Sequence, residues 1–421
     1  MSVAFNSDVN LTVEIGFDSN PLDASQSFSD VSAYVRSINT NRGRQHTLDE
    51  FQTGTCSVVL DNTDDRFNPL NTSSPYYDSS AGETKVKPFK KIRISAVYDS
   101  QTYRIFTGFI TGYPESFGGQ GSDSTVRVQA VDLFKLFNLN TIGSRGWLIG
   151  NSARSLIGQT TKLGYEDEEE LSSKRINRLL DAFGIADADR TVSTGRMDVQ
   201  AGQSRDTNLL TALKQVEQAE QGQFFIGADG NCIFRDRNYK RTQQFLSNAT
   251  FGNGVGELPF SDVITNFDES RISNIISVAR KGGVAQQVED NNSVDEFGSR
   301  EQSLTDTLNV SDTDALSIAQ QRLASFSTTT PRIEGLVINP VGDTNLWVQA
   351  LGREIGDKIT VKVPTLVSTT MEFDVHIESI SHTIDASSQT WAWNLSTSAG
   401  SEIGAWVLGS SKLGQDTNLA W

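Results

Sequence analysis

The chain has 421 residues, which is enough for two to four domains that each bury a core of their own. Its hydrophobic content of 37% and aromatic content of 9% indicate a globular protein, and its apolar runs are only a few residues long, which excludes a membrane span of ~20 residues. The formal net charge is −16, and residues 251–421 carry 10 Lys and Arg against 22 Asp and Glu, so this third of the chain is poorly suited to neutralise nucleic-acid phosphates.

Residues 1–139 are predicted to form a β-domain. Apolar and polar residues alternate from residue 9 to residue 17, which is typical of a half-buried strand. Further strands are predicted at residues 31–38, 55–60, 91–98, 103–111 and 125–131. Many short strands joined by turns indicate a sandwich or a barrel. The first eight residues lack the features of a signal peptide, so we expect assembly in a cytoplasm.

Residues 140–250 are predicted to form an inserted mixed α/β domain. Apolar residues at helical spacing predict helices at residues 133–137, 151–163 and 171–183, and a further helix that Asp206 caps and that ends at Gly222. Two short apolar runs flank residues 228–231, Ala-Asp-Gly-Asn, and predict a β-hairpin. The two cysteines, Cys56 and Cys232, are too few for a disulfide framework, and we interpret them as buried small apolar residues.

Residues 251–400 are predicted to form a second β-domain. Strands are expected at residues 273–280, 284–288, 333–338, 358–363, 373–384 and 390–396. One helix, capped by Ser311 or Asp312 and ending before Pro331, is inserted among them. Residues 401–421 have little periodic pattern and are interpreted as a docking tail. The predicted fold class is therefore α+β, mainly β, with two β-domains that flank the insertion.

The segment from Leu60 to Asn71 is dense in short polar side chains. Those that can hydrogen-bond to nearby backbone are Asp61, Asn62, Asp64, Asp65 and Asn68. Pro69 fixes one backbone angle, and Arg66 can pair with a neighbouring carboxylate. Phe67 and Leu70 are expected to anchor the segment on the strand that it leaves. We therefore predict a rigid, shaped loop.

Calcium binding is the alternative for this loop, because carboxylate oxygens are the ligands that Ca²⁺ prefers. The loop does not fit an EF-hand, since Thr63 stands at the third position and no glycine stands at the sixth. We interpret its carboxylates as structural.

Catalytic chemistry has little support in this sequence. The three histidines, His46, His376 and His382, have no nucleophile partner in the sequence. His376 and His382 are six residues apart on one predicted strand, which separates them by ~20 Å and prevents joint metal coordination. Signatures of the common hydrolases and NTPases are absent. We predict no catalytic residue, no cofactor and no metal.

Two blocks of sequence carry a family resemblance. The first comprises Arg42-Gly43-Arg44, residues 48–54, Leu60-Asp61-Asn62, Asp64, Arg66-Phe67, Pro69, Asn71 and residues 74–77. The second comprises Ile355-Gly356-Asp357 with the four residues that follow, residues 373–384 and residues 390–395. These blocks resemble the opening and the C-terminal domain of minor tail proteins of long-tailed bacteriophages, and residues 406–414 resemble their ending. Asp65 stands where those proteins more often have Gly, which makes a tight turn less expected there and favours an ordered acidic loop.

The resemblance implies a structural virion protein at the tail tip, similar to the baseplate hub of contractile tails. It implies two tube-like β-barrel domains and a homotrimer whose doubled domains imitate a hexameric ring, joining the tail tube to the tip around a DNA channel. The implied partners are other copies of the chain, a distal tail or tail tube protein, tip or fibre proteins and the tape measure protein, while DNA passes through without specific binding. We expect acidic residues of the second β-domain to line the channel. The nearest alternative is a hexameric distal tail protein.

The tryptophans leave a further alternative. Trp391 and Trp393 lie on one predicted strand face, with Trp347, Trp406 and Trp421 near them in sequence. Such clusters bind sugars in carbohydrate-binding receptor modules, but they occur more often in cores and subunit interfaces. The candidate structural or interface residues are Asp61, Asn62, Asp64, Asp65, Arg66, Phe67, Pro69, Asn71, Ile355, Gly356, Asp357, Trp391 and Trp393.

Overall fold

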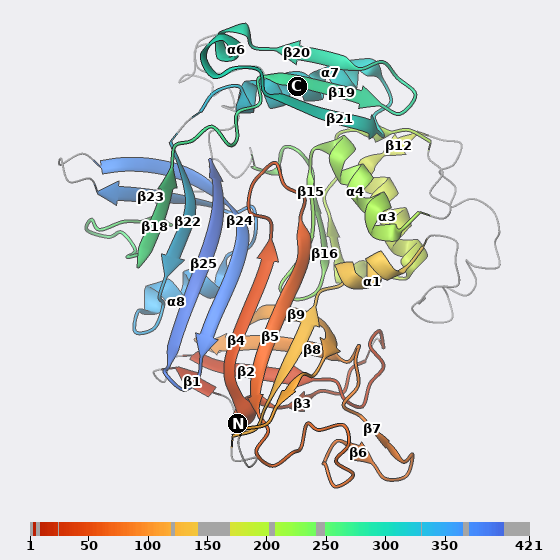
Figure 1. The fold of residues 1–421 in the computed structure, drawn as a ribbon, viewed down its shortest axis with the longest axis vertical. Helices are drawn as coiled ribbons and strands as arrows, with labels where there is room; N and C mark the ends of the chain where they lie inside the picture. Colours follow the sequence, from red (N-terminus) through yellow and green to blue (C-terminus); the bar gives the residue numbers. More distant parts are fainter. Residues whose placement is uncertain are drawn as a thin grey trace.

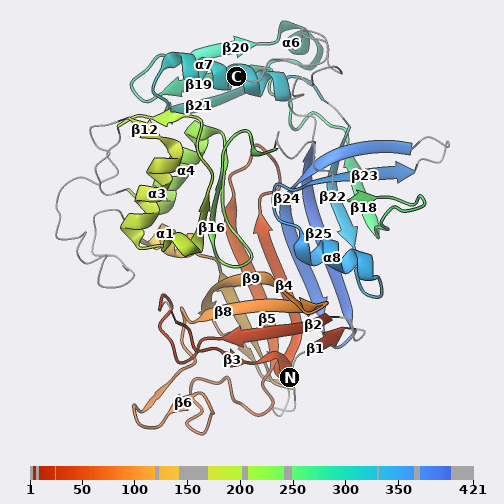
Figure 2. The ribbon, with the colours of Figure 1, turned by 180° about the vertical axis from the view of Figure 1, so that it is seen from behind.

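The computed structural model describes residues 3–5, 9–23, 25–118, 123–141, 169–201, 207–240, 249–329, 331–364 and 370–399. Within these ranges the protein is mainly β with six α-helices, which confirms the predicted α+β class (Figures 1 and 2). None of the described helices is long and apolar enough to span a membrane. The predicted helix at residues 151–163 and the predicted docking tail at residues 401–421 lie outside the described residues.

The first β region follows the predicted alternation closely. Its strands are β1 (Val3–Phe5), β2 (Val9–Ile15), β3 (Ser29–Asp30), β4 (Val35–Gly43), β5 (Gln52–Asp61), β6 (Tyr77–Asp78), β7 (Glu83–Thr84), β8 (Lys91–Tyr98), β9 (Gln101–Gly112), β10 (Glu115–Ser116) and β11 (Thr125–Val131). The predicted strands at residues 91–98 and 125–131 match β8 and β11 to the residue. The strand expected at residues 31–38 begins later and is longer, because a turn of 3₁₀ helix at Ser32–Tyr34 precedes β4.

One sheet joins both β regions. The strands of the second region are β17 (Thr250–Phe251), β18 (Asp262–Asn266), β22 (Arg332–Ile338), β23 (Lys358–Pro364), β24 (Thr370–Asp385) and β25 (Thr390–Ala399). The order along the sheet is β1-β2-β8-β9-β11-β5-β4-β24-β25-β22-β18, and β24 runs antiparallel to β4 with Ser379 opposite Gly43. The expected closed barrels are wrong for the described residues: the second edge of β4 pairs with β24, so that edge cannot close the first region on itself.

The core of the first region lies between crossing strands. Strands β2, β8 and β9 run across the ends of β4 and β5 in both views (Figures 1 and 2). Their buried faces share one apolar cluster with Phe67 of the loop after β5 and with Trp347 of α8 (Thr344–Gly352). The sequence reading missed α8, although Asp343 caps it by accepting from two backbone N–H groups.

The insertion packs helices against a small sheet. Its elements are α1 (Phe134–Leu139), β12 (Glu170–Leu171), α3 (Ser172–Phe183), a 3₁₀ turn (Asp187–Asp189), β13 (Arg190–Val192), β14 (Asp198–Val199), α4 (Leu209–Glu220), β15 (Gln223–Ile226) and β16 (Cys232–Arg235). Strands β15 and β16 form the predicted hairpin. Asn208, rather than the predicted Asp206, caps α4, and Asp206 itself lies outside the described residues. Cys56 and Cys232 are both buried and free, as predicted.

The helix expected inside the second β region belongs to a small module, which we call the upper module. It comprises β19 (Ile275–Arg280), β20 (Gln286–Glu289), α6 (Asn291–Phe297), β21 (Glu301–Thr307) and α7 (Asp312–Phe326). A capping box formed by Ser311 and Asp314 begins α7, and the module buries an apolar cluster of its own around Val278 and Ile318. Figure 1 shows the module above the ends of α4 and β24.

Candidate functional site

The loop at residues 61–71 is held in shape by its own side chains. The Asn62 side chain accepts from the Phe67 N–H at 2.9 Å, and the Asn71 side chain donates to the Asp65 carbonyl at 2.8 Å. Asp65 has a φ of 58°, in the left-handed region, and its N–H donates to the Asn62 carbonyl. A tight turn is therefore present within an ordered acidic loop, because aspartate tolerates this conformation better than most residues.

The carboxylates of this loop are used within the chain. Asp61 pairs with Arg36 at 2.7 Å, and Asp64 accepts from the Nε of Arg66 at 2.7 Å. The backbone N–H of Thr63, followed by Arg36, lowers the pKa of Asp61 to about 2, so this carboxylate is ionised at neutral pH. No group of three metal-ligating side chains gathers at this loop or elsewhere in the described part of the chain. The loop geometry is that of a structural element.

The two apolar anchors of the loop behave differently. Phe67 is fully buried and stacks on Tyr76 with ring centroids 5.6 Å apart, which confirms its anchoring role. Leu70 is 85% exposed, so its predicted anchoring role is wrong. The tip formed by Pro69 and Leu70 is exposed to solvent, as are Thr63 and Asp64.

The turn at residues 355–357 joins the insertion to the second β region. The Ile355 carbonyl accepts from Arg235 of β16, and the Gly356 N–H donates to the Ile377 carbonyl at 2.6 Å. Gly356 has a φ of 87°, and a Cβ at this position would overlap the Arg235 guanidinium. Asp357 closes the turn by accepting from the Glu354 N–H at 3.1 Å. Glycine is therefore required here for both conformation and space.

The tryptophans of β25 are core residues. Trp391 and Trp393 are fully buried, as is Trp347 of α8. Trp391 packs edge-on against Trp347 at 4.9 Å and donates its indole N–H to His382 at 3.1 Å. Sugar stacking needs an exposed ring face, so these three residues do not form a carbohydrate site. Trp406 and Trp421 lie outside the described residues.

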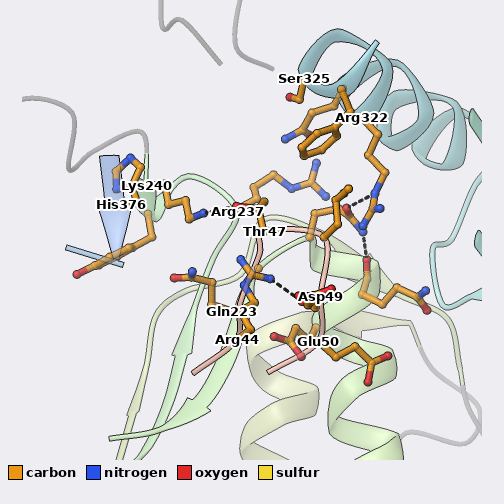
Figure 3. Close-up of a pocket in the computed structure, with 18 of the residues that line it drawn as sticks. Arg44, Thr47, Asp49, Glu50, Gln223, Arg237, Lys240, Arg322, Ser325 and His376 are labelled. Carbon is orange, nitrogen blue, oxygen red and sulfur yellow. Dashed lines mark hydrogen bonds between the residues drawn. The ribbon is translucent and has the colours of Figure 1, made fainter. Parts of the chain in front are cut away.

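A cavity of about 260 Å³ lies where the first β region, the insertion and the upper module meet (Figure 3). Its walls come from residues 44–50, the end of α4, the segment after β16, α7 and β24. Arg237 and Lys240 reach into it from the segment after β16, and Arg322 reaches into it from α7. Side chains from these three parts and from the second β region therefore converge on one space.

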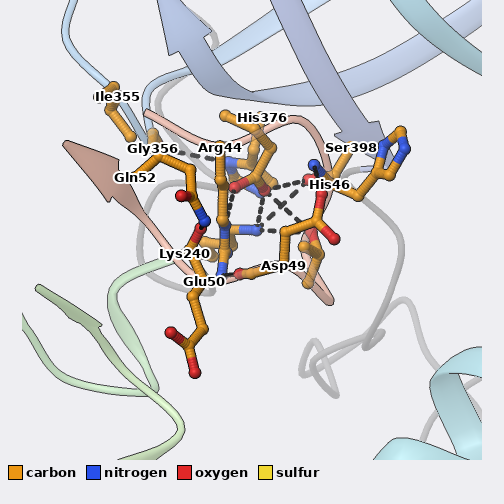
Figure 4. A network of polar contacts seen from close by, with 12 residues as sticks. Arg44, His46, Asp49, Glu50, Gln52, Lys240, Ile355, Gly356, His376 and Ser398 are labelled. Atoms are coloured by element: carbon orange, nitrogen blue, oxygen red, sulfur yellow. Dashed lines mark hydrogen bonds and ion pairs between the residues drawn. The ribbon is translucent and has the colours of Figure 1, made fainter. Parts of the chain in front are cut away.

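Beside this cavity, a buried carboxylate holds the parts together (Figure 4). Glu378 of β24 is fully buried, pairs with Arg44 at 2.7 Å and with Lys240, and accepts from the hydroxyls of Thr47 and Ser398. We call these five residues the Glu378 network. Burial favours the neutral form of Glu378, but the charges of Arg44 and Lys240 more than offset it, and its pKa is lowered.

The sequence reading missed the Glu378 network, although its signal was present. The motif Arg42-Gly43-Arg44 carried the family resemblance without a physical explanation. In the structure Gly43 has a φ of 111°, and a Cβ there would overlap the Glu378 carbonyl oxygen. Arg42 pairs with Glu354 at 3.0 Å, and Arg44 pairs with Glu378. The motif therefore joins β4 to the second β region.

Two adjacent cross-strand rows on the solvent face of the joined sheet are polar and uncharged, while the row beside them carries Arg127 and Asp385. One cross-strand row runs from Gln129 of β11 through Ser57 and Asn39 to Thr383 of β24, so it crosses the junction of the two β regions. The neighbouring row contains Thr55, Asn41, Ser381 and Asn394. All eight side chains are exposed or half-buried. The face is continuous over at least five strands.

Exposed apolar side chains form two groups along this sheet. Strand β18, at one end of the described strand order, exposes Ile264, and Phe267 follows it. In the second group, Phe117 follows β10, which pairs with β11, and Leu70 projects from the loop after β5, although β11 and β5 themselves stand inside the strand order. The predicted site residues thus fall into separate groups: Leu70 and its loop belong to this second group, while the 355–357 turn and the buried tryptophans lie within the molecule.

Comparison with known proteins identifies relatives of the fold. No protein-family model matches the chain, and no curated protein is similar to it in sequence. The structure resembles the 43 kDa tail protein of prophage MuSo2 from Shewanella oneidensis, with a TM-score of 0.53 and 10% identity over 93% of this chain and 97% of that one. It also resembles the tail protein from Neisseria meningitidis MC58, with a TM-score of 0.55 and 8% identity over 94% of this chain and 99% of that one. The chain therefore has the fold of solved phage-type tail proteins along nearly its whole length.

Proposed function

We propose that this protein is a structural subunit of a bacteriophage tail tip, a baseplate hub that assembles as a homotrimer. Its doubled β regions would form a pseudo-hexameric ring that joins the tail tube to the tip and surrounds the DNA channel. The role is structural, without catalysis. The observation that carries the proposal is the single sheet in which β4 of the first region pairs with β24 of the second. Two β regions fused edge to edge would give each copy two sixths of such a ring.

The joined sheet also suggests what DNA would meet. We expected an acidic channel lining, but the rows that include Ser57, Asn39 and Thr383 carry amide and hydroxyl groups. Where these two rows line the channel, DNA passes over uncharged polar groups that neither bind nor strongly repel phosphates. The acidic lining is therefore replaced in our proposal by a neutral one.

The sides of the sheet are the proposed contacts between copies. An exposed edge strand can pair with another chain, and a head-to-tail contact closes into a ring when its rotation permits. We place β18 with Ile264 and Phe267 on one side of this contact, and the loop tip at Leu70 with Phe117 on the other. The remaining proposed partners, a distal tail or tube protein, tip or fibre proteins and the tape measure protein, would stack above, below or within the ring of the virion.

The division into residues 1–139, 140–250, 251–400 and a docking tail at 401–421 remains part of this proposal, as does assembly in the host cytoplasm. Two apolar clusters cross these boundaries. Trp347 and Trp391 of the second region complete the core of the first, and Phe51 and Phe109 of the first region belong to the core of the insertion.

Ring symmetry tests the proposal. Native mass spectrometry and electron cryo-microscopy of the purified chain, alone and with tail tube protein, should give three copies with two superimposable β regions each. Six copies would instead identify a hexameric distal tail protein. In the interface test, Ile264→Lys and Leu70→Asp should each abolish the ring, while Val284→Lys, at a 68% exposed position of the upper module, should leave it intact. Unchanged rings in the first two variants would contradict the proposed contact.

A further inference from the structure

The cavity at the junction is lined by five basic and four acidic side chains, and some of the basic side chains are not paired with these carboxylates. Its basic residues are Arg44, Lys214, Arg237, Lys240 and Arg322, and its acidic residues are Asp49, Glu50, Glu217 and Asp236. Arg44 and Lys240 are bound to Glu378, and Lys214 pairs with Glu217 at 2.7 Å. Asp49 and Glu50 are exposed to solvent at the rim. Arg237 and Arg322 are the two cations of the cavity whose guanidinium groups are incompletely paired among the described residues.

Arg322 is held only by neutral acceptors among the described residues. Its Nε donates to the amide oxygen of Gln221 at 2.9 Å, and its Nη1 donates to the amide oxygen of Gln302 at 3.1 Å. Burial, and then the positive charge of Arg44, lowers the pKa of Arg322 to about 10. Two like charges therefore stand near each other at this wall of the cavity: Arg44 is paired with Glu378, whereas the hydrogen bonds of Arg322 to described residues go to amide oxygens. A guanidinium in this setting favours a planar anionic partner.

Arg237 and Gln223 leave polar atoms unpaired. The Nε of Arg237 donates to the Glu220 carbonyl at 3.0 Å and lies 3.8 Å from the Glu220 carboxylate, but its Nη2 has no partner among the described residues. The side chain of Gln223 is 4% exposed, and neither its amide nitrogen nor its amide oxygen has a partner there. A buried polar atom without a partner is costly to the folded state, by about 1–3 kcal/mol. Both residues line the cavity.

We propose that this cavity binds a small oxyanion, a phosphate or carboxylate group, between the guanidinium groups of Arg237 and Arg322. The Gln223 amide nitrogen supplies a further donor. A cavity of about 260 Å³ admits a phosphate or a short dicarboxylate but not a nucleic-acid strand. The bound anion contacts α7 on one side and the segment after β16 on the other, so it ties the upper module to the insertion. This site is independent of the proposed ring.

Titration of the full chain with two probes tests this site. Isothermal titration calorimetry and thermal unfolding at constant ionic strength, with inorganic phosphate in one arm and succinate in the other, should give saturable binding and a rise in Tm for at least one probe. The arm that responds identifies the source of the oxyanion. Arg322→Gln and Arg237→Gln should each weaken binding at least tenfold, and Arg127→Gln, on the exposed face of β11, should bind like the unaltered chain.

Two controls keep the outcome decisive. Arg322→Lys retains the charge but loses the planar fork, so it should fold and bind with an intermediate affinity. Absence of saturable binding by the unaltered chain in both arms would overturn the proposal. Equal weakening in Arg127→Gln and Arg322→Gln would also overturn it, because this result marks nonspecific attraction to surface charge.

Discussion

The Glu378 network and the basic cavity lie side by side and share Arg44, Thr47 and Lys240, yet their polar groups are satisfied in different ways. In the network, one buried carboxylate receives two cations and two hydroxyls, all from distant parts of the chain. In the cavity, Arg322 meets neutral amides, and Arg237 has an unpaired nitrogen. A buried charge that has all its partners stabilises the fold. A pair of arginines that are incompletely paired, such as Arg237 and Arg322, is suited to bind an anionic ligand.

The largest effect is expected from removing the central carboxylate of the network. Glu378→Ala leaves Arg44 and Lys240 buried without their shared partner, and breaking such a pair costs up to about 5 kcal/mol of unfolding free energy. Urea unfolding measures this loss. The matched control is Glu372→Ala, because Glu372 is 60% exposed and lies 3.6 Å from Lys362 at the surface, so its loss is expected to cost less than about 1 kcal/mol. Equal losses in the two variants would remove the distinction between a structural network and ordinary surface pairs.

The network was beyond the reach of sequence reasoning because its members are far apart along the chain. Arg44 and Glu378 are 334 residues apart, and nothing in alternation or capping predicts which distant strands pair. The joining of β4 to β24 escaped prediction for the same reason, and it replaced two closed barrels by one open sheet. The cavity could not be predicted for the same reason, because its walls come from segments that are far apart along the chain.

Local features were predicted well because they depend on neighbouring residues. Strands β8 and β11, the β15–β16 hairpin and the cap of α7 follow from periodicity and turn chemistry. The loop at residues 61–71 was predicted to be rigid, and its side chains do bind its own backbone. Its charge pattern could not reveal that Leu70 points away, since an apolar side chain indicates burial without naming the surface that covers it.

A change of pH should test how the two buried histidines, His376 and His382, contribute to stability. His376 lines the cavity, and burial, with the charge of Lys240, lowers its pKa to about 4, while burial lowers the pKa of His382 to about 3. The unfolded chain takes up protons at these sites below about pH 6.5, whereas the folded chain does not, so the contribution of these two histidines to stability falls as the pH falls. Between pH 7 and pH 5 each histidine should remove about 2 kcal/mol.

Urea unfolding at these two pH values checks the titration. Burial raises the pKa of Asp132 to about 7, so its protonation in the folded chain favours stability as the pH falls, and it does so equally in the variant and in the unaltered chain. The variant His376→Gln should therefore lose about 2 kcal/mol less than the unaltered chain between pH 7 and pH 5. A variant that retains the full change would show that His376 is protonated in the folded chain.

Replacing Gly356 tests how much the close packing of the 355–357 turn contributes to stability. An alanine at this position is strained by its φ of 87°, and its Cβ would meet Arg235 and the Gln223 amide. We expect Gly356→Ala to destabilise the fold by about 2 kcal/mol. Gly282→Ala has a similar φ of 73° with no atom within 4 Å, so it reports the backbone strain alone, about 1 kcal/mol. Identical Tm values for the two variants would show that the packing around Gly356 contributes nothing.

The smallest effects compare one hydrogen-bonding residue of each cluster. Ser398→Ala removes a hydroxyl that donates to Glu378 and should cost about 1 kcal/mol. Gln223→Met replaces an amide whose two polar atoms have no partner among the described residues, so it should leave stability within about 0.5 kcal/mol or raise it, because no hydrogen bond is lost and a buried polar group is removed. Urea unfolding in a buffer free of phosphate and carboxylate gives both values. Adding phosphate or succinate should then stabilise the unaltered chain more than Gln223→Met, since the variant lacks one donor to the anion. A large loss of stability in Gln223→Met without added anion would instead mean that the amide belongs to the structural network, and the contrast between the two clusters would disappear.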